Sequence, residues 1–260
     1  MKQNLLHLYW IAFKSIATKE TNRYLRIWIQ TLLPSVITTS LYFIVFGQMV
    51  GSRVGDMGGF SYMAFIVPGL IMMSSITSAY SNVSSSFFSQ KFQRNIEEIL
   101  VAPVPASMII LGFVAGGTGR SLIVGTLVTM VSLFFIPLHV HSWFAVILVL
   151  VLTAVLFSLG GLVNGVLARN YDDVSIMSTF VLQPLTYLGG VFYSIAALPP
   201  FWKTVSSFNP IVYMISGFRY GFLGVEDVPF VVSIGVLILI IAILYAVNWY
   251  LIKTGRGLRS

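Results

Sequence analysis

Cysteine is absent from the 260-residue chain, and charged residues are scarce. Without cysteine the protein has no disulfides, no thiolate metal ligands and no catalytic thiol. Charged side chains make up 9% of the residues against 57% for hydrophobic ones, and the mean hydropathy is +0.90. This composition excludes an ordinary soluble domain. The phosphate-binding pattern G-x-x-x-x-G-K-[ST] is also missing, so any ATP-driven role requires a second polypeptide.

Long apolar runs occupy most of the chain and predict an all-α polytopic membrane protein. We expect one transmembrane domain over residues 1–260 with six membrane helices. The six spans are expected near residues 27–50, 60–88, 107–136, 143–168, 174–193 and 228–252, and a basic tail follows at 253–260. Residues 1–26 interleave basic and apolar side chains at helical spacing. This pattern indicates either an amphipathic helix in the membrane interface or a simple basic anchor.

The basic residues are divided unevenly between the two sets of loops. Three lie in one set, at Arg53, Lys203 and Arg219, while Arg120 falls inside a span. The other eleven are Lys2, Lys14, Lys19, Arg23, Arg26, Lys91, Arg94, Arg169, Lys253, Arg256 and Arg259. Because cytoplasmic loops carry the excess of Lys and Arg, both termini are expected in the cytoplasm. The net charge of +7 then reflects membrane orientation, and no nucleic acid partner is expected.

One polar segment, residues 90–105, interrupts the apolar pattern between the second and third expected spans. At 3.6 residues per turn its apolar side chains share one face, and its charged side chains lie toward the other. The apolar set is Phe92, Ile96, Ile99 and Leu100, and the charged set is Arg94, Glu97 and Glu98. Pro103 and Pro105 end the helix because they cannot donate a backbone N–H. The segment is either a short amphipathic docking helix or a solvated turn.

The amino-acid sequence of this segment resembles a motif of a known protein family. Residues 97–105 are similar to the E-E-L-L-V-[TA]-P-V segment of ABC-2 type transporter permeases, and the likeness extends to residues 69–73, 209–210 and 217–221. The resemblance implies a cytoplasmic coupling helix that docks onto a separate ATPase subunit. The residues implied in coupling are Phe92, Arg94, Glu97, Glu98, Ile99, Leu100 and Pro103. Asn95 and Ile96 depart from the Gly-Thr that many members carry before the glutamates.

Further expectations follow from the same resemblance. Two copies of the permease would form the pathway in a bacterial inner membrane, among membrane lipids, with two ATPase subunits beneath them. ATP and magnesium would bind to those subunits, and this chain would hold no cofactor and no metal and perform no catalysis. Residues 194–227, divided by prolines, resemble two short re-entrant helices that help to close the outer end. Asn209, Pro210 and Arg219 are then candidate gate residues.

Small and polar residues within the spans suggest close contacts. Gly112 and Gly116 form a G-x-x-x-G pair on a glycine-rich face of the third span that can pack tightly. The hydroxyl residues of the second span either pack or line a polar path. Arg120 is either a buried arginine bonded to backbone or a neighbouring helix, or a contact for a cargo headgroup. We expect Asp172 or Asp173 to cap the fifth span.

The sequence therefore favours an ATP-driven exporter permease for an amphipathic, lipid-like or glycan substrate. The alternative is an ion-coupled secondary transporter, which would need carboxylates at mid-membrane depth. All eight acidic residues, Glu20 among them, map to loops or span ends. An intramembrane enzyme is disfavoured because none of the histidines, His7, His139 and His141, lies within a span. The last two lack the nearby partners that a metal site requires.

Overall fold

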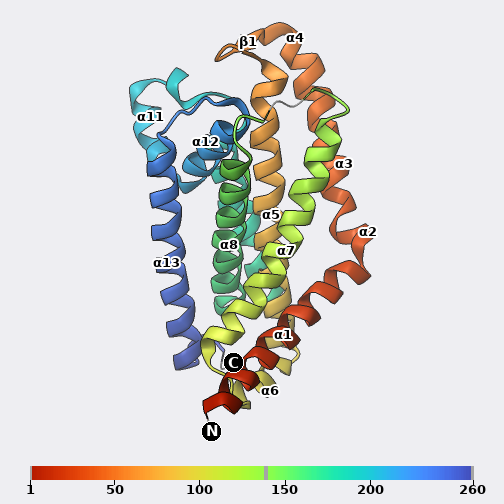
Figure 1. The fold of residues 1–260 in the computed structure, drawn as a ribbon, viewed down its shortest axis with the longest axis vertical. Coiled ribbons are helices and arrows are strands. Elements are labelled where there is room, and N and C mark those ends of the chain that lie inside the picture. Colours follow the sequence, from red (N-terminus) through yellow and green to blue (C-terminus); the bar gives the residue numbers. More distant parts are fainter. Residues whose placement is uncertain (1, 138–139, 259–260) are drawn as a thin grey trace.

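Long parallel and antiparallel helices form an upright bundle in the computed structural model, which describes residues 2–137 and 140–258. Five helical segments within these ranges are long and apolar enough to cross a membrane (Figure 1). They are Trp28–Gly47, α5 (Tyr62–Phe92), α7 (Ala106–Ser132), α8 (Trp143–Leu167) and α13 (Phe230–Thr254). They coincide with five of the six expected spans. Of the expected basic tail, residues 259–260, including Arg259, lie outside the described residues, as does His139.

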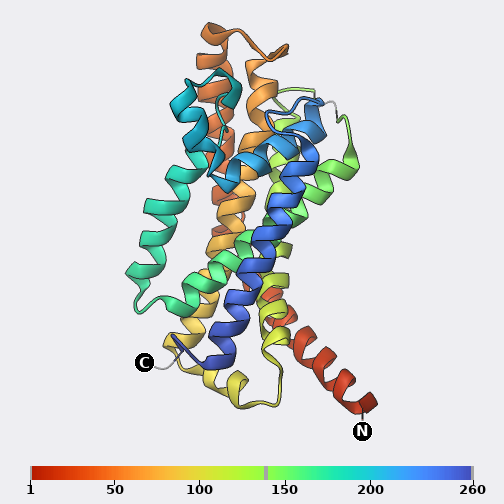
Figure 2. The ribbon, with the colours of Figure 1, turned by 90° about the vertical axis from the view of Figure 1, so that its left-hand side faces the viewer.

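The first span is built from several helical pieces. These are α2 (Trp28–Thr31), α3 (Leu33–Tyr42) and the π-helix η1 (Phe43–Val50). A break at Ile27 separates them from α1 (Lys2–Arg26), which crosses α7 obliquely and extends away from the bundle at its N-terminal end (Figures 1 and 2). Helix α1 therefore changes direction before the first span begins.

The glycine-rich face of α7 packs against α1. A Cβ added at Gly112 would lie 2.6 Å from Ile16, and one added at Gly116 would lie 2.4 Å from Glu20 Cβ. Gly119 faces the hydroxyl of Tyr24. The predicted tight packing is confirmed: Gly112 and Gly116 receive α1, while Gly117 and Gly125 closely approach side chains of α5 and α8.

Helix α5 lies at the centre of the bundle between α7 and α8 (Figure 1). It continues through Pro68, and most of its side chains are buried. A Cβ added at Gly161 of α8 would meet the Tyr80 carbonyl oxygen at 2.4 Å. The two helices thus approach each other backbone to backbone at this point.

The fifth expected span is a shorter helical stretch. It consists of α9 (Tyr171–Ile176), the π-helix η2 (Met177–Leu182) and α10 (Gln183–Tyr187). It begins with Asn170, whose side chain accepts the N–H of Asp173 at 2.7 Å. The expectation that Asp172 or Asp173 caps this helix was wrong. Asn170 has extended backbone and takes the cap, while the Asp173 carboxylate reaches back to the Arg169 N–H at 2.9 Å.

Several short elements gather at the end of the molecule opposite both termini (Figure 1). They are α4 (Gly51–Val54), a hairpin of β1 (Asp56–Met57) and β2 (Phe60–Ser61), the 3₁₀-helix η3 (Ile195–Ala197), α11 (Pro200–Ser207) and α12 (Pro210–Leu223). The two short helices expected between the last two spans are therefore present as α11 and α12. Helix α12 is largely buried and packs on α5, α8 and α13. The hairpin is a small exception to the all-helical expectation.

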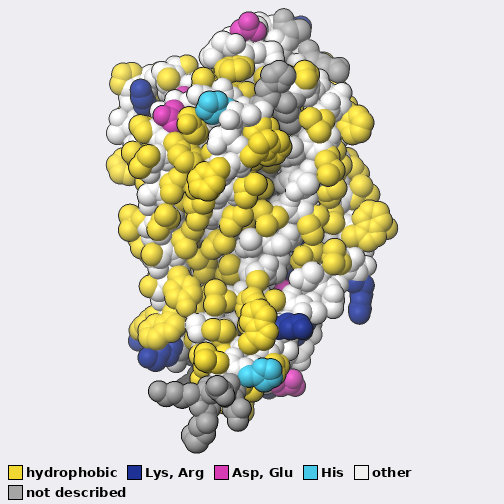
Figure 3. Space-filling model, in the orientation of Figure 1, with side chains coloured by type: hydrophobic (Ala, Val, Ile, Leu, Met, Phe, Trp, Pro, Cys, Tyr) yellow, Lys and Arg dark blue, Asp and Glu magenta, His cyan; other side chains and the backbone are white. Residues whose placement is uncertain are grey.

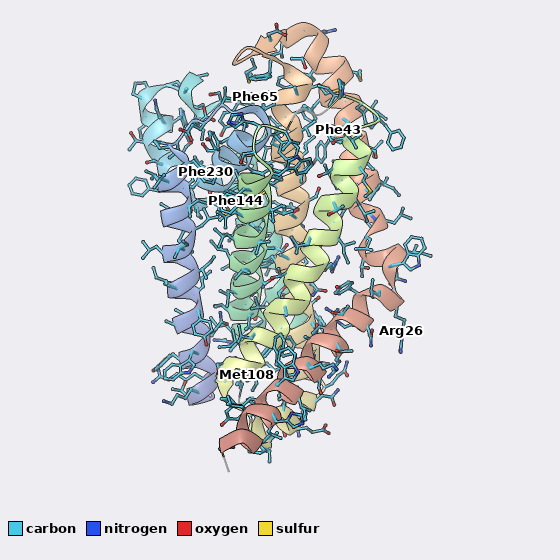
Figure 4. The ribbon with its side chains drawn as sticks, viewed as in Figure 1. Arg26, Phe43, Phe65, Met108, Phe144 and Phe230 are labelled. Carbon is cyan, nitrogen blue, oxygen red and sulfur yellow. The ribbon has the colours of Figure 1, made fainter. Side chains whose placement is uncertain are left out.

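Apolar and charged side chains occupy different regions of the surface. Hydrophobic side chains cover the middle of the face shown in Figure 3, and most of its Lys and Arg side chains lie toward the end that carries the termini. Arg26 at the end of α1 and Met108 near the start of α7 both lie in the lower part of the molecule, whereas Phe65 and Phe230 lie near the opposite end (Figure 4).

Candidate functional site

The polar segment between α5 and α7 is not the single helix that its periodicity predicts. Helix α5 continues to Phe92, and α6 (Asn95–Val101) begins after a sharp turn at Arg94, which has a positive φ of 62°. A non-glycine residue rarely adopts this left-handed conformation, so the sequence gives no warning of the break. The chain leaves α6 through extended backbone at Ala102, immediately before Pro103.

This break divides the predicted apolar face. Ile96 is buried, at 1% exposure, and anchors α6 to the bundle. Phe92 belongs instead to α5 and is 63% exposed, with its ring 5.3 Å from that of Tyr171. Ile99 is half-buried, and Leu100 is exposed. The expectation that these four side chains share one face was wrong because the turn at Arg94 reorients the chain between Phe92 and Ile96.

The charged side of α6 is open. Glu97 and Glu98 are exposed and lie in the first turn, where the helix dipole favours negative charge. Within the described residues neither forms an ion pair. Val101, at 86% exposure, adds an apolar side chain to the same small helix. Helix α6 thus presents a carboxylate pair and an apolar end.

A groove of about 590 Å³ separates α6 from the end of α13. Arg94, Glu97, Leu100 and Val101 line one side, and Ile252, Lys253, Thr254, Gly255 and Leu258 line the other. The sequence predicted only a basic tail at residues 253–260, and it did not place that tail beside α6. The juxtaposition makes the C-terminal turn part of the same surface.

Two tethers join this surface to the bundle. Lys91 donates to the carbonyl oxygens of Val166 and Ala168 at 2.8 and 2.7 Å, which fixes the end of α5 to the end of α8. The second tether involves α1 and is centred on a residue that sequence reasoning did not single out. Glu20 is fully buried, and its carboxylate accepts Ser86 Oγ at 2.8 Å and Gln90 Nε2 at 3.0 Å.

Arg23 and Arg120 extend this polar cluster. Arg23 pairs with Glu20 at 3.2 Å and donates to the Asn82 side chain at 2.8 Å. Arg120 donates to the Thr31 carbonyl at 2.8 Å and more weakly to Asn82 at 3.4 Å. We expected Arg120 either to bond to backbone or a neighbouring helix, or to contact a cargo headgroup. The contacts with Thr31 and Asn82 agree with the first expectation. A cargo contact at Arg120 stays a prediction.

The candidate gate residues have clear structural partners. Arg219 is 1% exposed, pairs with Asp227 at 2.7 Å, donates to the Gly190 carbonyl at 2.7 Å and lies 3.8 Å above the Phe65 ring. Burial lowers the pKa of Arg219 to about 10, and the Asp227 carboxylate opposes this shift. The guanidinium therefore stays charged at neutral pH.

Asn209 and Pro210 start α12. The Asn209 side chain accepts the Ile211 N–H at 3.0 Å and donates to the Leu185 carbonyl at 2.7 Å. Pro210 occupies the first helical turn, where its missing N–H costs nothing. Asn209 thus joins the start of α12 to α10.

A second groove, of about 240 Å³, lies between the first span, α5 and α10. Among the described residues its lining holds no charged side chain, and it combines hydroxyl and amide groups with a larger apolar surface. The lining residues are Pro34, Ser35, Thr38, Thr39, Tyr42, Leu70, Met73, Ser74, Thr77, Gln183, Thr186 and Tyr187. Some hydroxyl residues of α5 are buried in helix packing, and others, such as Ser74 and Thr77, line this groove. A role of these residues in a polar path stays a prediction. Among the described residues no group of three or more His, Asp or Glu could hold a metal ion.

Comparison with known proteins gives a consistent result. The sequence profile of the ABC-2 type transporter family matches residues 11–223. The inner membrane transport permease YadH of Escherichia coli strain K12 is 66% identical over 256 residues, which cover 98% of this chain and 100% of the relative. The protein of the same name from Shigella flexneri has the same identity and coverage. Nodulation protein J of Rhizobium leguminosarum bv. viciae is 25% identical over 224 residues, or 86% of each chain.

Proposed function

The chain belongs to the ABC-2 type transporter family as an inner-membrane permease subunit, and we propose that it is the membrane half of an ATP-driven exporter. Such permeases are non-catalytic and pair with ABC ATPase subunits. In the proposed assembly two copies of this chain, each a single domain over residues 1–260, stand above two ATPase subunits that bind ATP and magnesium. The cargo is an amphipathic, lipid-like or glycan molecule that leaves the cytoplasm or the inner leaflet.

The proposed topology has six spans with both termini in the cytoplasm. The five long apolar helices are joined by the helical stretch from Tyr171 to Tyr187. At 1.5 Å per residue these 17 residues are about 25 Å long, slightly less than the roughly 30 Å hydrocarbon core. An even number of spans is supported by the position of both termini at the same end of the molecule (Figure 1). Helices α11 and α12 would be re-entrant on the outer side.

Coupling would pass from the ATPase to the spans through α6 and α1. The carboxylate pair of Glu97 and Glu98 provides the charged contact, and Arg94 with the apolar end of α6 borders it. The Lys91 contacts would transmit displacement of α6 to α8. The buried carboxylate of Glu20 would do the same between α1 and α5. The proposed coupling consists only of helix movements, so none of these residues makes or breaks a covalent bond.

The observation that carries this proposal is the pair of exposed carboxylates on α6, which form no ion pair within the described residues and lie toward the end of the molecule that carries the termini. We expect the double variant Glu97→Lys/Glu98→Lys to insert into the membrane but to lose co-purification with the ATPase and stimulation of its activity. The test is a pull-down in mild detergent from the native membrane, followed by an ATPase assay. Asp56→Lys is the matched control, because Asp56 is an exposed carboxylate in the outer hairpin. Unchanged ATPase recovery in the double variant would defeat the assignment.

The ion-coupled alternative lacks the groups that it needs. None of the eight acidic residues lies within the five long apolar helices. Glu20 is buried, but it lies in α1 and pairs with Arg23. Recovery of the permease without any ATPase, under conditions that preserve a control complex, would favour this alternative.

A further inference from the structure

A cluster of charged and polar side chains lies where α1 ends and the first span begins. Gly116 of α7 faces Glu20 of α1. One turn further along α7, Arg120 donates to the carbonyl oxygen of Thr31, in the first turn of the span Trp28–Gly47, at 2.8 Å. Because the basic and apolar pattern of α1 places this helix at the membrane surface, the cluster lies at the boundary between headgroups and hydrocarbon. We call it the α1 cluster, and its members are Lys19, Glu20, Arg23, Asn82, Ser86, Gln90 and Arg120.

The α1 cluster contains more positive than negative charge. Its carboxylate is that of Glu20, which pairs with Arg23 at 3.2 Å. Lys19 donates to the Gln90 side chain at 3.1 Å, and Gln90 in turn donates to Glu20. Within the described residues Arg120 forms no ion pair. Three cations therefore share one carboxylate, which leaves an excess of two positive charges in the cluster.

The two arginines converge on one neutral atom. The Oδ1 atom of Asn82 accepts Arg23 Nη2 at 2.8 Å and Arg120 Nη1 at 3.4 Å. An amide oxygen carries no full charge, so it cannot compensate two guanidinium groups held so close together. Near a membrane the repulsion between them is weakened less by solvent than in water. A further anion beside the two guanidinium groups would remove this repulsion.

Hydrogen-bond donors are also in surplus. Asn82 is fully buried, and its Nδ2 atom, which belongs to the amide between the two guanidinium groups, has no partner among the described residues. The Nε atoms of Arg23 and Arg120 lack partners as well. The bonds that Arg23 makes all use Nη2. Its side chain is 33% exposed, and Arg120 is half-buried, so an anion can reach both groups from the surface.

The surroundings of the α1 cluster favour a phosphate that is attached to a lipid. A guanidinium fork matches the oxygens of a phosphate group. Beside the cluster, the turn between α1 and the first span exposes the apolar side chains of Leu25, Ile27 and Trp28. Acyl chains can cover such a surface, and tryptophan is typical of the membrane interface. A free phosphate ion would leave these side chains uncovered.

We propose that the α1 cluster binds the phosphate of an anionic phospholipid, which remains there as a structural lipid between α1, α5 and α7. The lipid supplies the acceptor oxygens that the surplus donors lack and compensates part of the excess charge. This site is separate from the groove between the first span, α5 and α10, because that groove is lined by none of the cluster residues. The proposal goes beyond the exporter function and does not depend on the cargo.

Native mass spectrometry of the full chain in mild detergent tests the proposal by measuring the fraction of protein that carries an added lipid. The probes are phosphatidylglycerol, phosphatidylcholine and soluble glycerol phosphate, each titrated separately. The test variant is Arg120→Gln. Its matched control is Arg53→Gln, because Arg53 is an exposed arginine of α4, at the opposite end of the molecule (Figure 1). The measurement needs neither ATP nor the ATPase.

We expect phosphatidylglycerol to bind at least about tenfold more tightly than phosphatidylcholine, whose choline charge cancels that of its phosphate. Arg120→Gln should weaken phosphatidylglycerol binding by about tenfold or more, the effect of losing one charge-assisted hydrogen bond. Arg120→Lys should lose less, because it keeps the charge, and Arg53→Gln should leave binding unchanged. Phosphatidylglycerol should also raise the thermal unfolding midpoint of the original protein, but not that of Arg120→Gln.

Glu20→Gln gives a test of opposite sign. This change keeps a hydrogen-bond acceptor for Ser86 and Gln90 but removes the negative charge that competes with the lipid. Phosphatidylglycerol binding should therefore tighten by about threefold or more. A purely structural role of the cluster predicts no such gain. Arg23→Gln, at the exposed edge of the cluster, should weaken binding and repeats the test if Arg120→Gln does not fold.

Four results would overturn the proposal. Equal affinities for phosphatidylglycerol and phosphatidylcholine would show that the cluster does not select an anionic lipid. Equal losses in Arg120→Gln and Arg53→Gln would indicate general attraction to a basic protein. Binding of glycerol phosphate as tight as that of the lipid would indicate a site for a free phosphate. Weaker phosphatidylglycerol binding by Glu20→Gln would show that the excess charge does not hold the lipid.

Discussion

The adjacent glycines Gly160 and Gly161 of α8 allow a sharp test of how closely α5 and α8 pack. A Cβ at position 161 would lie 2.4 Å from the Tyr80 carbonyl oxygen and 3.2 Å from its carbonyl carbon and Cα. A Cβ at position 160 would lie 3.9 Å from the nearest atoms, which belong to the Tyr80 ring. The same change, Gly→Ala, therefore meets backbone at one position and ordinary van der Waals contact at the next.

The expected magnitudes follow from two opposing effects. Replacing a helical glycine by alanine stabilises a helix by up to about 1 kcal/mol at either position. At position 161 the backbone of α5 cannot turn aside, so the helices must separate by several tenths of an ångström. A gap of about 0.5–1 Å between α5 and α8 would lose a quarter to a half of the dispersion energy of their contact. Overpacking of a well-packed contact costs about 1–3 kcal/mol. We expect Gly161→Ala to be less stable than Gly160→Ala by about 2 kcal/mol.

The assay is thermal unfolding of the two purified variants in mild detergent, followed by tryptophan fluorescence. Gly160→Ala should unfold at or slightly above the temperature of the original protein, and Gly161→Ala clearly below it. Equal midpoints for the two variants would show that α5 and α8 do not approach backbone to backbone at Tyr80, and the close-packing argument would be refuted.

Two further predictions concern buried charges. Asp227→Asn leaves the guanidinium of Arg219 buried and unpaired, so the free energy of unfolding should fall by about 3–5 kcal/mol, and Arg219→Met in the same chain should restore part of it. The same thermal unfolding measurement checks this, and a loss below about 1 kcal/mol would show that the pair is not needed. Glu20→Ala leaves the donors of Ser86 and Gln90 without an acceptor and should cost about 1–3 kcal/mol, whereas Glu20→Gln keeps an acceptor and should cost less than half of that. Equal losses in the two Glu20 variants would contradict the contacts assigned to the carboxylate.

Much of the fold was predictable because it depends on local properties. A run of apolar residues long enough to cross the bilayer forms a helix whatever its neighbours are, since its backbone must satisfy its own hydrogen bonds there. Five expected spans were found in this way. Proline positions likewise predicted α11 and α12, because Pro200 and Pro210 each begin a helix.

The candidate site was predictable only in outline. The sequence located the polar segment between α5 and α7, its two glutamates and the family to which the chain belongs. It did not reveal the turn at Arg94 or the exposed position of Phe92. Both depend on Ile96 and Lys91 finding partners in the bundle, and those partners are distant in sequence.

The sequence by itself determined the membrane class, the five long apolar helices and the family, because hydropathy, proline and motif are properties of contiguous residues. Only the tertiary structure decided that the glycine face of α7 receives α1, that Glu20 is buried against Gln90 and that Arg219 pairs with Asp227. It also decided that Ser35, Thr38 and Gln183 line one uncharged groove. These are relations between separate helices, and inside a membrane they are set by close packing and by the need of each buried polar group for a partner.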